Sequence, residues 1–197
     1  MTMAKSPRLA PQSPIEPAHR RRSVDISRCF VALWPDLAAR DALDALASRL
    51  RGNHPASRHT PREQLHLTLA FIGALENQKA SDVADTLRKI EAEPFDWRLD
   101  QCAGFERAHI LWAGGPDEPR LIGLAHRVRE SLDELHVAYD RKPFSAHVTL
   151  LRNVARAAFL RLDTPINWRV EKPRLVISDR DATGKTHYVS WGDRSLE

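Results

Sequence analysis

Apolar positions along the chain recur in two spacings, which predict a mixture of helices and strands. Leu43, Leu46 and Leu50 follow the spacing of an amphipathic helix that begins after Asp36, a typical N-cap residue. The same spacing predicts helices over residues 77–92 and 118–137. Short apolar or alternating runs predict strands at 29–34, 65–73, 95–99, 110–113, 146–152, a strand pair at 168–170 and 175–178, and 188–191. This is an α+β pattern with mainly antiparallel strands and helices outside.

The two most apolar of these strands carry the same short motif, His-x-Thr-x. The copies are His66-Leu67-Thr68-Leu69 and His147-Val148-Thr149-Leu150. Because alternate residues of a strand face opposite sides, each His and Thr should share one face, while the intervening apolar residues and Phe71 face the core. A strand, a helix and then the motif strand occur in both halves, which predicts two pseudo-symmetric lobes around a central cleft. Both motifs would line that cleft.

The positive charge of the chain lies in its first residues. We expect a basic, Pro-rich disordered tail at 1–27 and the folded domain at 28–197. Residues 1–28 hold six basic and two acidic side chains, which accounts for the net charge of +4 and leaves 24 of each sign in the remaining chain. A folded domain with no net charge favours a small site that binds one phosphate or one chain end over an extended surface that binds a long nucleic acid.

Composition excludes several other classes of protein. No segment is long and apolar enough to span a membrane, and no apolar stretch follows the basic tail as in a secretory signal. Cys29 and Cys102 form neither a disulfide framework nor a zinc signature. We therefore expect a cytoplasmic protein that acts as a monomer without contact to membranes.

Two histidines and two threonines in one cleft suit the hydrolysis of a cyclic phosphate. One neutral imidazole accepts a proton from the attacking water, and one imidazolium donates a proton to the departing ribose oxygen, because the pKa of histidine lies near working pH. Thr68 and Thr149 can donate hydrogen bonds to the non-bridging phosphate oxygens. These groups need no metal or other cofactor.

A zinc site at His66 and His147 is the competing interpretation. It lacks a third His, Cys or carboxylate at ligand spacing. A single His-x-Thr in a strand carries little information, whereas two copies in similar apolar strands indicate function. The other histidines are expected to be surface or satisfied residues: His54 and His59 in a polar loop, His126 and His136 on a helix, and His109 and His187 beside strands.

At these motifs the chain resembles the two-histidine (2H) phosphoesterases, and most closely the RNA 2′,3′-cyclic phosphodiesterases first described as bacterial 2′-5′ RNA ligases. The matching stretches are 28–35, 65–73 and 142–152, and the resemblance covers about residues 28–192. It implies a bilobal α+β fold and conversion of an RNA 2′,3′-cyclic phosphate to a 2′-phosphomonoester.

The resemblance also implies roles for individual residues. His66 matches the proton donor and His147 the proton acceptor, Thr68 and Thr149 match phosphate-binding residues, and Arg152 matches an arginine near the site. Strict alternation places Arg152 on the face opposite His147, so its role requires a bulge or a strand end. Phe30 and Phe71 are candidates for stacking on a base, with burial in the core as the alternative.

Three functional hypotheses follow. The first is a metal-independent phosphodiesterase acting on RNA that ends in a 2′,3′-cyclic phosphate, such as a tRNA fragment. The second is a 2′-5′ RNA ligase acting on tRNA halves, in which the 5′-hydroxyl of a second RNA replaces water at the same site. The third is a non-catalytic protein that binds RNA ends or nucleotides, which would have no need for two titrating groups.

Overall fold

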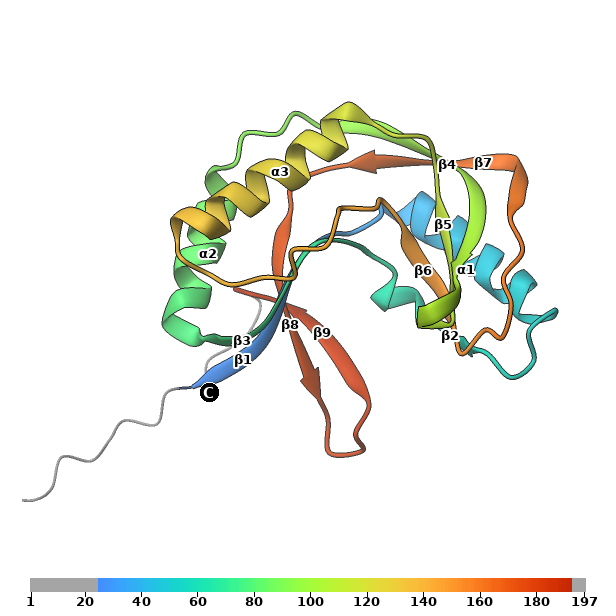
Figure 1. Cartoon of the computed structure of the whole chain (residues 1–197), viewed down its shortest axis with the longest axis horizontal. Coiled ribbons are helices and arrows are strands. Elements are labelled where there is room, and N and C mark those ends of the chain that lie inside the picture. Colours follow the sequence, from blue (N-terminus) through green and yellow to red (C-terminus); the bar gives the residue numbers. More distant parts are fainter. Residues whose placement is uncertain (1–24, 193–197) are drawn as a thin grey trace, which may run out of the picture.

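Nine strands form one sheet, and three α-helices pack against it, in the computed structural model, which describes residues 25–192 (Figure 1). The strands are β1 (Ile26–Leu33), β2 (Arg58–His59), β3 (Leu67–Glu76), β4 (Phe95–Phe105), β5 (Ile110–Gly114), β6 (Val148–Arg152), β7 (Leu160–Val170), β8 (Arg174–Arg180) and β9 (Thr186–Ser190). The α-helices are α1 (Leu37–Arg51), α2 (Asn77–Lys89) and α3 (Pro119–Glu134). The order is β7-β4-β5-β6-β3-β1-β8-β9, with β2 paired to β6. These pairings are antiparallel, so the expected α+β class is confirmed.

The sheet consists of two lobes that meet at the motif strands. The first lobe contains β1, β3, β8 and β9, and the second contains β2, β4, β5, β6 and β7. A single residue pair, Leu67 of β3 opposite Val148 of β6, joins them. The predicted bilobal arrangement is therefore confirmed, and the junction between the lobes runs through both motifs.

Two of the helices pack on the lobe opposite to that of a strand next to them in the chain. Helix α1 follows β1 in the chain but packs on β6 and β7 of the second lobe, whereas α3 precedes β6 but packs on β3 of the first lobe. Helix α2 packs on β8 of the first lobe. Figure 1 shows α2 and α3 together over one half of the sheet and α1 over the other half. The exchange ties the two lobes together on both sides of the junction.

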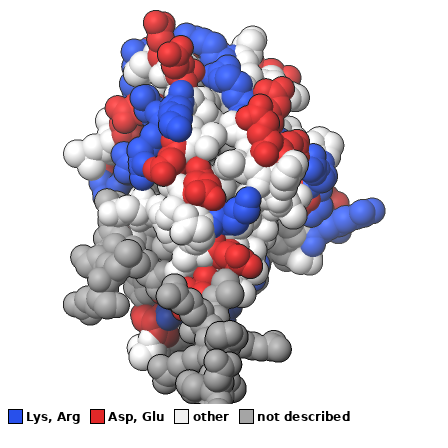
Figure 2. Space-filling view, turned by 90° about the vertical axis from the view of Figure 1, so that its left-hand side faces the viewer, with Lys and Arg blue, Asp and Glu red and all other residues white. Residues whose placement is uncertain are grey.

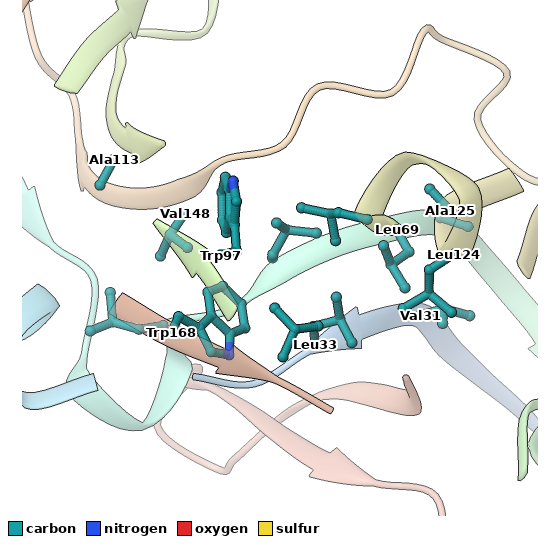
Figure 3. Packing of buried hydrophobic residues seen from close by; sticks show 14 of the residues in the cluster. Val31, Leu33, Leu69, Trp97, Ala113, Leu124, Ala125, Val148 and Trp168 are labelled. Carbon is teal, nitrogen blue, oxygen red and sulfur yellow. The ribbon is translucent and has the colours of Figure 1, made fainter. Parts of the chain in front are cut away.

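A continuous apolar core supports this junction (Figure 3). Leu69 and Leu124 bring β3 and α3 together, and Trp97 and Trp168 pack with their ring centroids 5.8 Å apart in the second lobe. The apolar stripe expected on α1 is buried, and the Asp36 carboxylate accepts a hydrogen bond from the Ala39 backbone N–H as the predicted N-cap.

Several element boundaries differ from the predictions. Strand β1 begins at Ile26, inside the segment assigned to the tail, because Ile26 pairs with the far end of β3 at Glu76. The rest of the predicted tail, residues 1–24, lies outside the described residues. Helices α2 and α3 each end three residues before the predicted limit.

The strands expected at 168–170 and 175–178 are present, but the expected pairing between them is wrong. Strand β7 pairs with β4 at one edge of the sheet, and β8 pairs with β1 in the other lobe. The residue before Pro173 is restricted to extended conformations, so the connection at 171–173 carries the chain onward instead of folding it back. Pro165 inside β7 is compatible with an edge strand, where one side needs no ladder hydrogen bonds.

Candidate active site

The two motifs face each other across the antiparallel junction. Leu67 lies opposite Val148, so the same register places His66 opposite Thr149 and Thr68 opposite His147. Each histidine therefore lies across from the threonine of the other motif. The four side chains predicted from the sequence are brought together in one place, around the axis that relates the lobes.

Both histidines are held in the same tautomer. Each lies one residue before its strand, and its Nδ1 lies within hydrogen-bond distance of the backbone carbonyl two residues earlier: 2.6 Å to the Gln64 oxygen for His66 and 2.8 Å to the Ser145 oxygen for His147. A carbonyl oxygen can only accept, so Nδ1 carries the hydrogen and donates it. The Nε2 atom of each ring is left for proton exchange.

Aromatic rings surround both imidazoles. Trp34 stacks on His66 with an interplanar angle of 24°, and Phe30 and Tyr188 lie with their ring centroids 5.0 and 5.3 Å from it. Around His147 the corresponding positions are taken by Phe105, edge-on at 4.9 Å, and Trp112 at 6.3 Å. These rings fix the orientation of the histidines and remove water from their faces.

Burial controls the protonation of the two histidines. It lowers the pKa of His66 to about 4, with the positive charge of Arg152 and the presence of His147 acting in the same direction, against the Gln64 carbonyl, which raises it. Burial and Arg152 also lower the pKa of His147. Both imidazoles of the free protein are therefore mainly neutral at pH 7.

A β-bulge in each motif strand turns one further side chain into the site. In β6, Leu151 pairs with Leu111 and Thr149 with Trp112, which leaves Leu150 as the extra residue. Arg152 therefore returns to the face of Thr149, as its expected role required.

The pairing of β3 with β1 has two irregularities, and the bulge at the motif lies at Leu69, because Val31 pairs with Ala70 and Ala32 with Thr68. Its consequence is that Phe71 lies on the side of Thr68 and is 41% exposed, so the expected place of Phe71 in the core is wrong. Phe30 is buried, as its core interpretation predicted. Phe71 and Arg152 occupy equivalent positions in the two motifs.

Two hollows open on either side of the motif residues. The cationic cavity, of about 540 Å³, is lined by His66, Thr149 and Arg152 together with Arg58, Arg180 and Lys185. The aromatic groove, of about 410 Å³, is lined by Thr68, His147, Phe71, Phe105 and Phe144. Pseudo-symmetric strands have therefore produced a site with two chemically different ends.

Several residues of this site were not predicted. His59, expected to be a surface or satisfied residue, lies half-buried in β2 and lines the cavity, with its Nε2 3.4 Å from the Asp44 carboxylate. Arg58, Arg180 and Lys185 carried no signal because each lies in a polar segment outside both motifs. Among residues 25–192, no three His, Cys, Asp or Glu side chains lie close enough to hold a metal ion. No helix in that range is long and apolar enough to cross a bilayer.

Known proteins share both the sequence pattern and the fold. The RNA 2′,3′-cyclic phosphodiesterase of Escherichia coli is 29% identical over 137 residues, covering 68% of this chain and 77% of that protein. That of Archaeoglobus fulgidus is 30% identical over 128 residues, covering 64% and 72%. The crystal structure of E. coli LigT complexed with 3′-AMP superposes with a TM-score of 0.72 and 28% identity over 85% of this chain and 96% of that one. The model of the 2′-5′ RNA ligase superfamily matches residues 35–182, and the chain belongs to this superfamily.

Proposed function

We propose that this protein hydrolyses the 2′,3′-cyclic phosphate at the end of an RNA to a 2′-phosphomonoester, with His66 as general acid, His147 as general base and no metal ion. The observation that carries the proposal is the crossed arrangement of the two His-x-Thr motifs, with both Nε2 atoms left for proton exchange. The relatives named RNA 2′,3′-cyclic phosphodiesterase support the reaction class.

The proposed reaction gives each of these groups a role, with the acid and the base assigned as the family resemblance implies. His147 Nε2 accepts a proton from water as the water oxygen attacks phosphorus. The bond between phosphorus and O3′ breaks, and His66 Nε2 donates a proton to O3′. Thr68, Thr149 and Arg152 bind the non-bridging oxygens, whose charge grows in the transition state. The product keeps the phosphate on O2′, and each histidine has exchanged its protonation state.

Because its pKa is low, His66 can act as the general acid only if the bound substrate raises that pKa. A general acid with a pKa of about 4 is mainly unprotonated at neutral pH. The negative charge of a bound phosphate stabilises the imidazolium and raises its pKa, so His66 becomes an effective acid only when substrate is present. His147, whose pKa is also lowered, is already neutral and ready to accept a proton.

The terminal base of the RNA is assigned to the aromatic groove. Phe71 presents an exposed ring beside Thr68 and His147, and its other neighbour is the Arg28 guanidinium, 5.3 Å from the ring centroid. A base stacked on an aromatic side chain is held without regard to its identity, which suits a protein that reads RNA ends.

Hydrolysis of adenosine 2′,3′-cyclic phosphate by single variants tests the proposal. We expect His66→Ala and His147→Ala each to lower kcat by about 100-fold or more, the usual contribution of a positioned acid or base. His126→Ala, an exposed histidine on α3, is the matched control and should keep wild-type activity. Full activity in either motif variant would contradict the acid–base roles, and inactivation by EDTA would contradict metal independence.

Ligation is the reverse use of the same site, since a ribose 5′-hydroxyl can replace water as the nucleophile. The superfamily is named for this activity. Incubation with tRNA halves, one ending in the cyclic phosphate, would show a joined product if ligation competes with hydrolysis.

A further inference from the structure

The cationic cavity holds more positive charge than a single phosphate requires. Arg152 already lies beside His66 and Thr149, where the reacting phosphate is assigned. Three more cations line the same cavity: Arg58, Arg180 and Lys185. They come from β2 and from the β8–β9 hairpin, so segments distant in the sequence converge on one space of about 540 Å³.

No carboxylate balances this charge. The cavity lining contains no Asp or Glu, and within residues 25–192 none of the four cations forms an ion pair. Some cations elsewhere are paired, as Arg141 is with Asp133 and Arg161 with Asp100. Figure 2 shows basic and acidic side chains interspersed on another face of the molecule. The cavity therefore gathers four cations in a lining that holds no carboxylate.

Two of the cations are direct neighbours across a strand pair. Arg58 of β2 lies opposite Arg152 of β6. Like charges at directly opposite positions destabilise a sheet, and both side chains remain exposed to the cavity. An anion bound between the strands would remove this repulsion.

The hairpin that supplies the other two cations is held in place. Its carboxylate at the tip, Asp181, accepts hydrogen bonds from the Thr183 and Lys185 backbone N–H groups, and its second oxygen lies 2.7 Å from His187 Nε2. A hydrogen bond from the Thr183 hydroxyl, followed by the His187 contact and the backbone bonds, lowers the pKa of Asp181 and holds its carboxylate in the turn. The Thr186 carbonyl at the start of β9 accepts a hydrogen bond of 2.7 Å from Gln64, two residues before His66. The hairpin is thus anchored to the motif loop.

The geometry of ribose indicates which anion would reach this cavity. In a nucleoside 2′,3′-cyclic phosphate, the O2′ side of the ring leads to C1′ and the base, and the O3′ side leads to C4′, C5′ and the preceding phosphate. With His66 donating to O3′ from the cavity side, the preceding phosphate points into the cavity. The base then points the other way, toward Phe71 in the aromatic groove.

We propose that Arg58, Arg180 and Lys185 bind the phosphodiester that precedes the cyclic phosphate in an RNA strand, so that the protein prefers oligonucleotide ends to mononucleotides. This inference rests on the proposed function, because it takes the cyclic phosphate to be at the motifs. Although the folded domain has no net charge, this local cluster of cations is sufficient to bind a second phosphate.

Three substrates that differ in what the 5′-oxygen of the terminal nucleotide carries test the preference. They are adenosine 2′,3′-cyclic phosphate, the same nucleotide with a 5′-phosphate, and the dinucleotide ApA ending in a 2′,3′-cyclic phosphate. We expect the two that carry a second phosphate to have kcat/KM at least about tenfold higher, the scale of one hydrogen bond between charged groups. Equal kcat/KM for all three would overturn the inference while leaving the proposed function intact.

Variants assign the preference to the hairpin. Arg180→Ala and Lys185→Ala should each lower the ratio of kcat/KM between ApA and the mononucleotide by about fivefold to tenfold. Lys89→Ala, an exposed lysine on α2, is the matched control and should keep the wild-type ratio. A variant that lowers both values equally has only a structural effect and would count against the assignment.

Affinity measurements separate this inference from catalysis. Calorimetry should show adenosine 2′,5′-bisphosphate binding about tenfold more tightly than adenosine 2′-phosphate, with the difference reduced in Arg180→Ala. Equal affinities would refute the second phosphate site whatever the enzyme activity. If no cyclic phosphate is hydrolysed, the proposed function fails, and the two affinities still decide whether the cavity binds a second phosphate.

Discussion

The protonation of His66 is the most demanding test of the proposed chemistry. In the free protein burial lowers its pKa to about 4, so the residue assigned as the acid is neutral at pH 7. The test is to bind one anion at the motifs and to measure the change in the pKa of His66. Adenosine 2′-phosphate, the expected product, supplies this anion without turnover.

The size of the effect can be worked out from Coulomb's law. A unit negative charge about 4 Å from an imidazolium stabilises it by about 4 kcal/mol at an effective dielectric constant of about 20. At 1.36 kcal/mol for each tenfold change, this is about a thousandfold shift in the protonation equilibrium. The sign is toward the charged form, so bound phosphate raises the pKa of His66 from about 4 into the neutral range.

Nitrogen-detected NMR titration of the His66 ring, with and without adenosine 2′-phosphate, measures this directly. The His66→Gln variant assigns the signal. The pH dependence of kcat/KM, which reports the free protein, should accordingly lie at lower pH than that of kcat, which reports the complex. A pKa of His66 at or above 6.5 in the free protein, or no change on binding, would refute the reasoning.

Three further predictions concern other parts of the account. Arg152→Ala removes a positive charge that lowers the pKa of both histidines, so both pKa values should rise in NMR titrations. The same variant loses a phosphate contact, so kcat/KM should fall by about 10- to 100-fold. Unchanged pKa values would contradict the role of Arg152. Phe71→Leu should raise KM for nucleotide substrates by about fivefold to tenfold, because stacking on the base is lost; an unchanged KM would show that the base lies elsewhere. Gly115→Ala places a Cβ against the Arg98 carbonyl oxygen and should lower the free energy of unfolding by about 1–3 kcal/mol in urea denaturation. The control Gly123→Ala lies inside α3, where an added Cβ would make only an ordinary contact with the Arg127 side chain, so it should be neutral or stabilising. Equal effects of the two changes would contradict the packing argument.

Local pattern predicted the elements that carry the chemistry. Spacing of leucines located α1, the short side chain of Asp36 located its N-terminus, and alternation in the apolar strands grouped each His with its Thr. These features depend only on neighbouring residues, which the sequence displays directly.

The bulges could not be placed from the sequence. Leu69 and Leu150 lie in runs where the following residues, Ala70 and Leu151, are apolar too, so burial is satisfied in either register. The shift in register became visible only in the pairing with β1 and β5. It reversed the expected side of Phe71 and supplied the side required for Arg152.

Long-range partners were also beyond the sequence pattern. An amphipathic face shows that a helix is buried but does not name its partner, so the exchange of α1 and α3 between lobes was not predicted. The cations of the cavity lie in three separate segments of the chain, and only the folded sheet brings Arg58 and the β8–β9 hairpin to the same cavity as Arg152.

The identity of the product tests the central claim most directly. Wild-type protein is incubated with adenosine 2′,3′-cyclic phosphate, and phosphorus NMR follows the opening of the ring. Protonation of O3′ by His66 predicts adenosine 2′-phosphate as the product, at a rate that falls by about 100-fold or more in His66→Ala. Formation of the 3′-phosphate, or an undiminished rate in His66→Ala, would contradict the account.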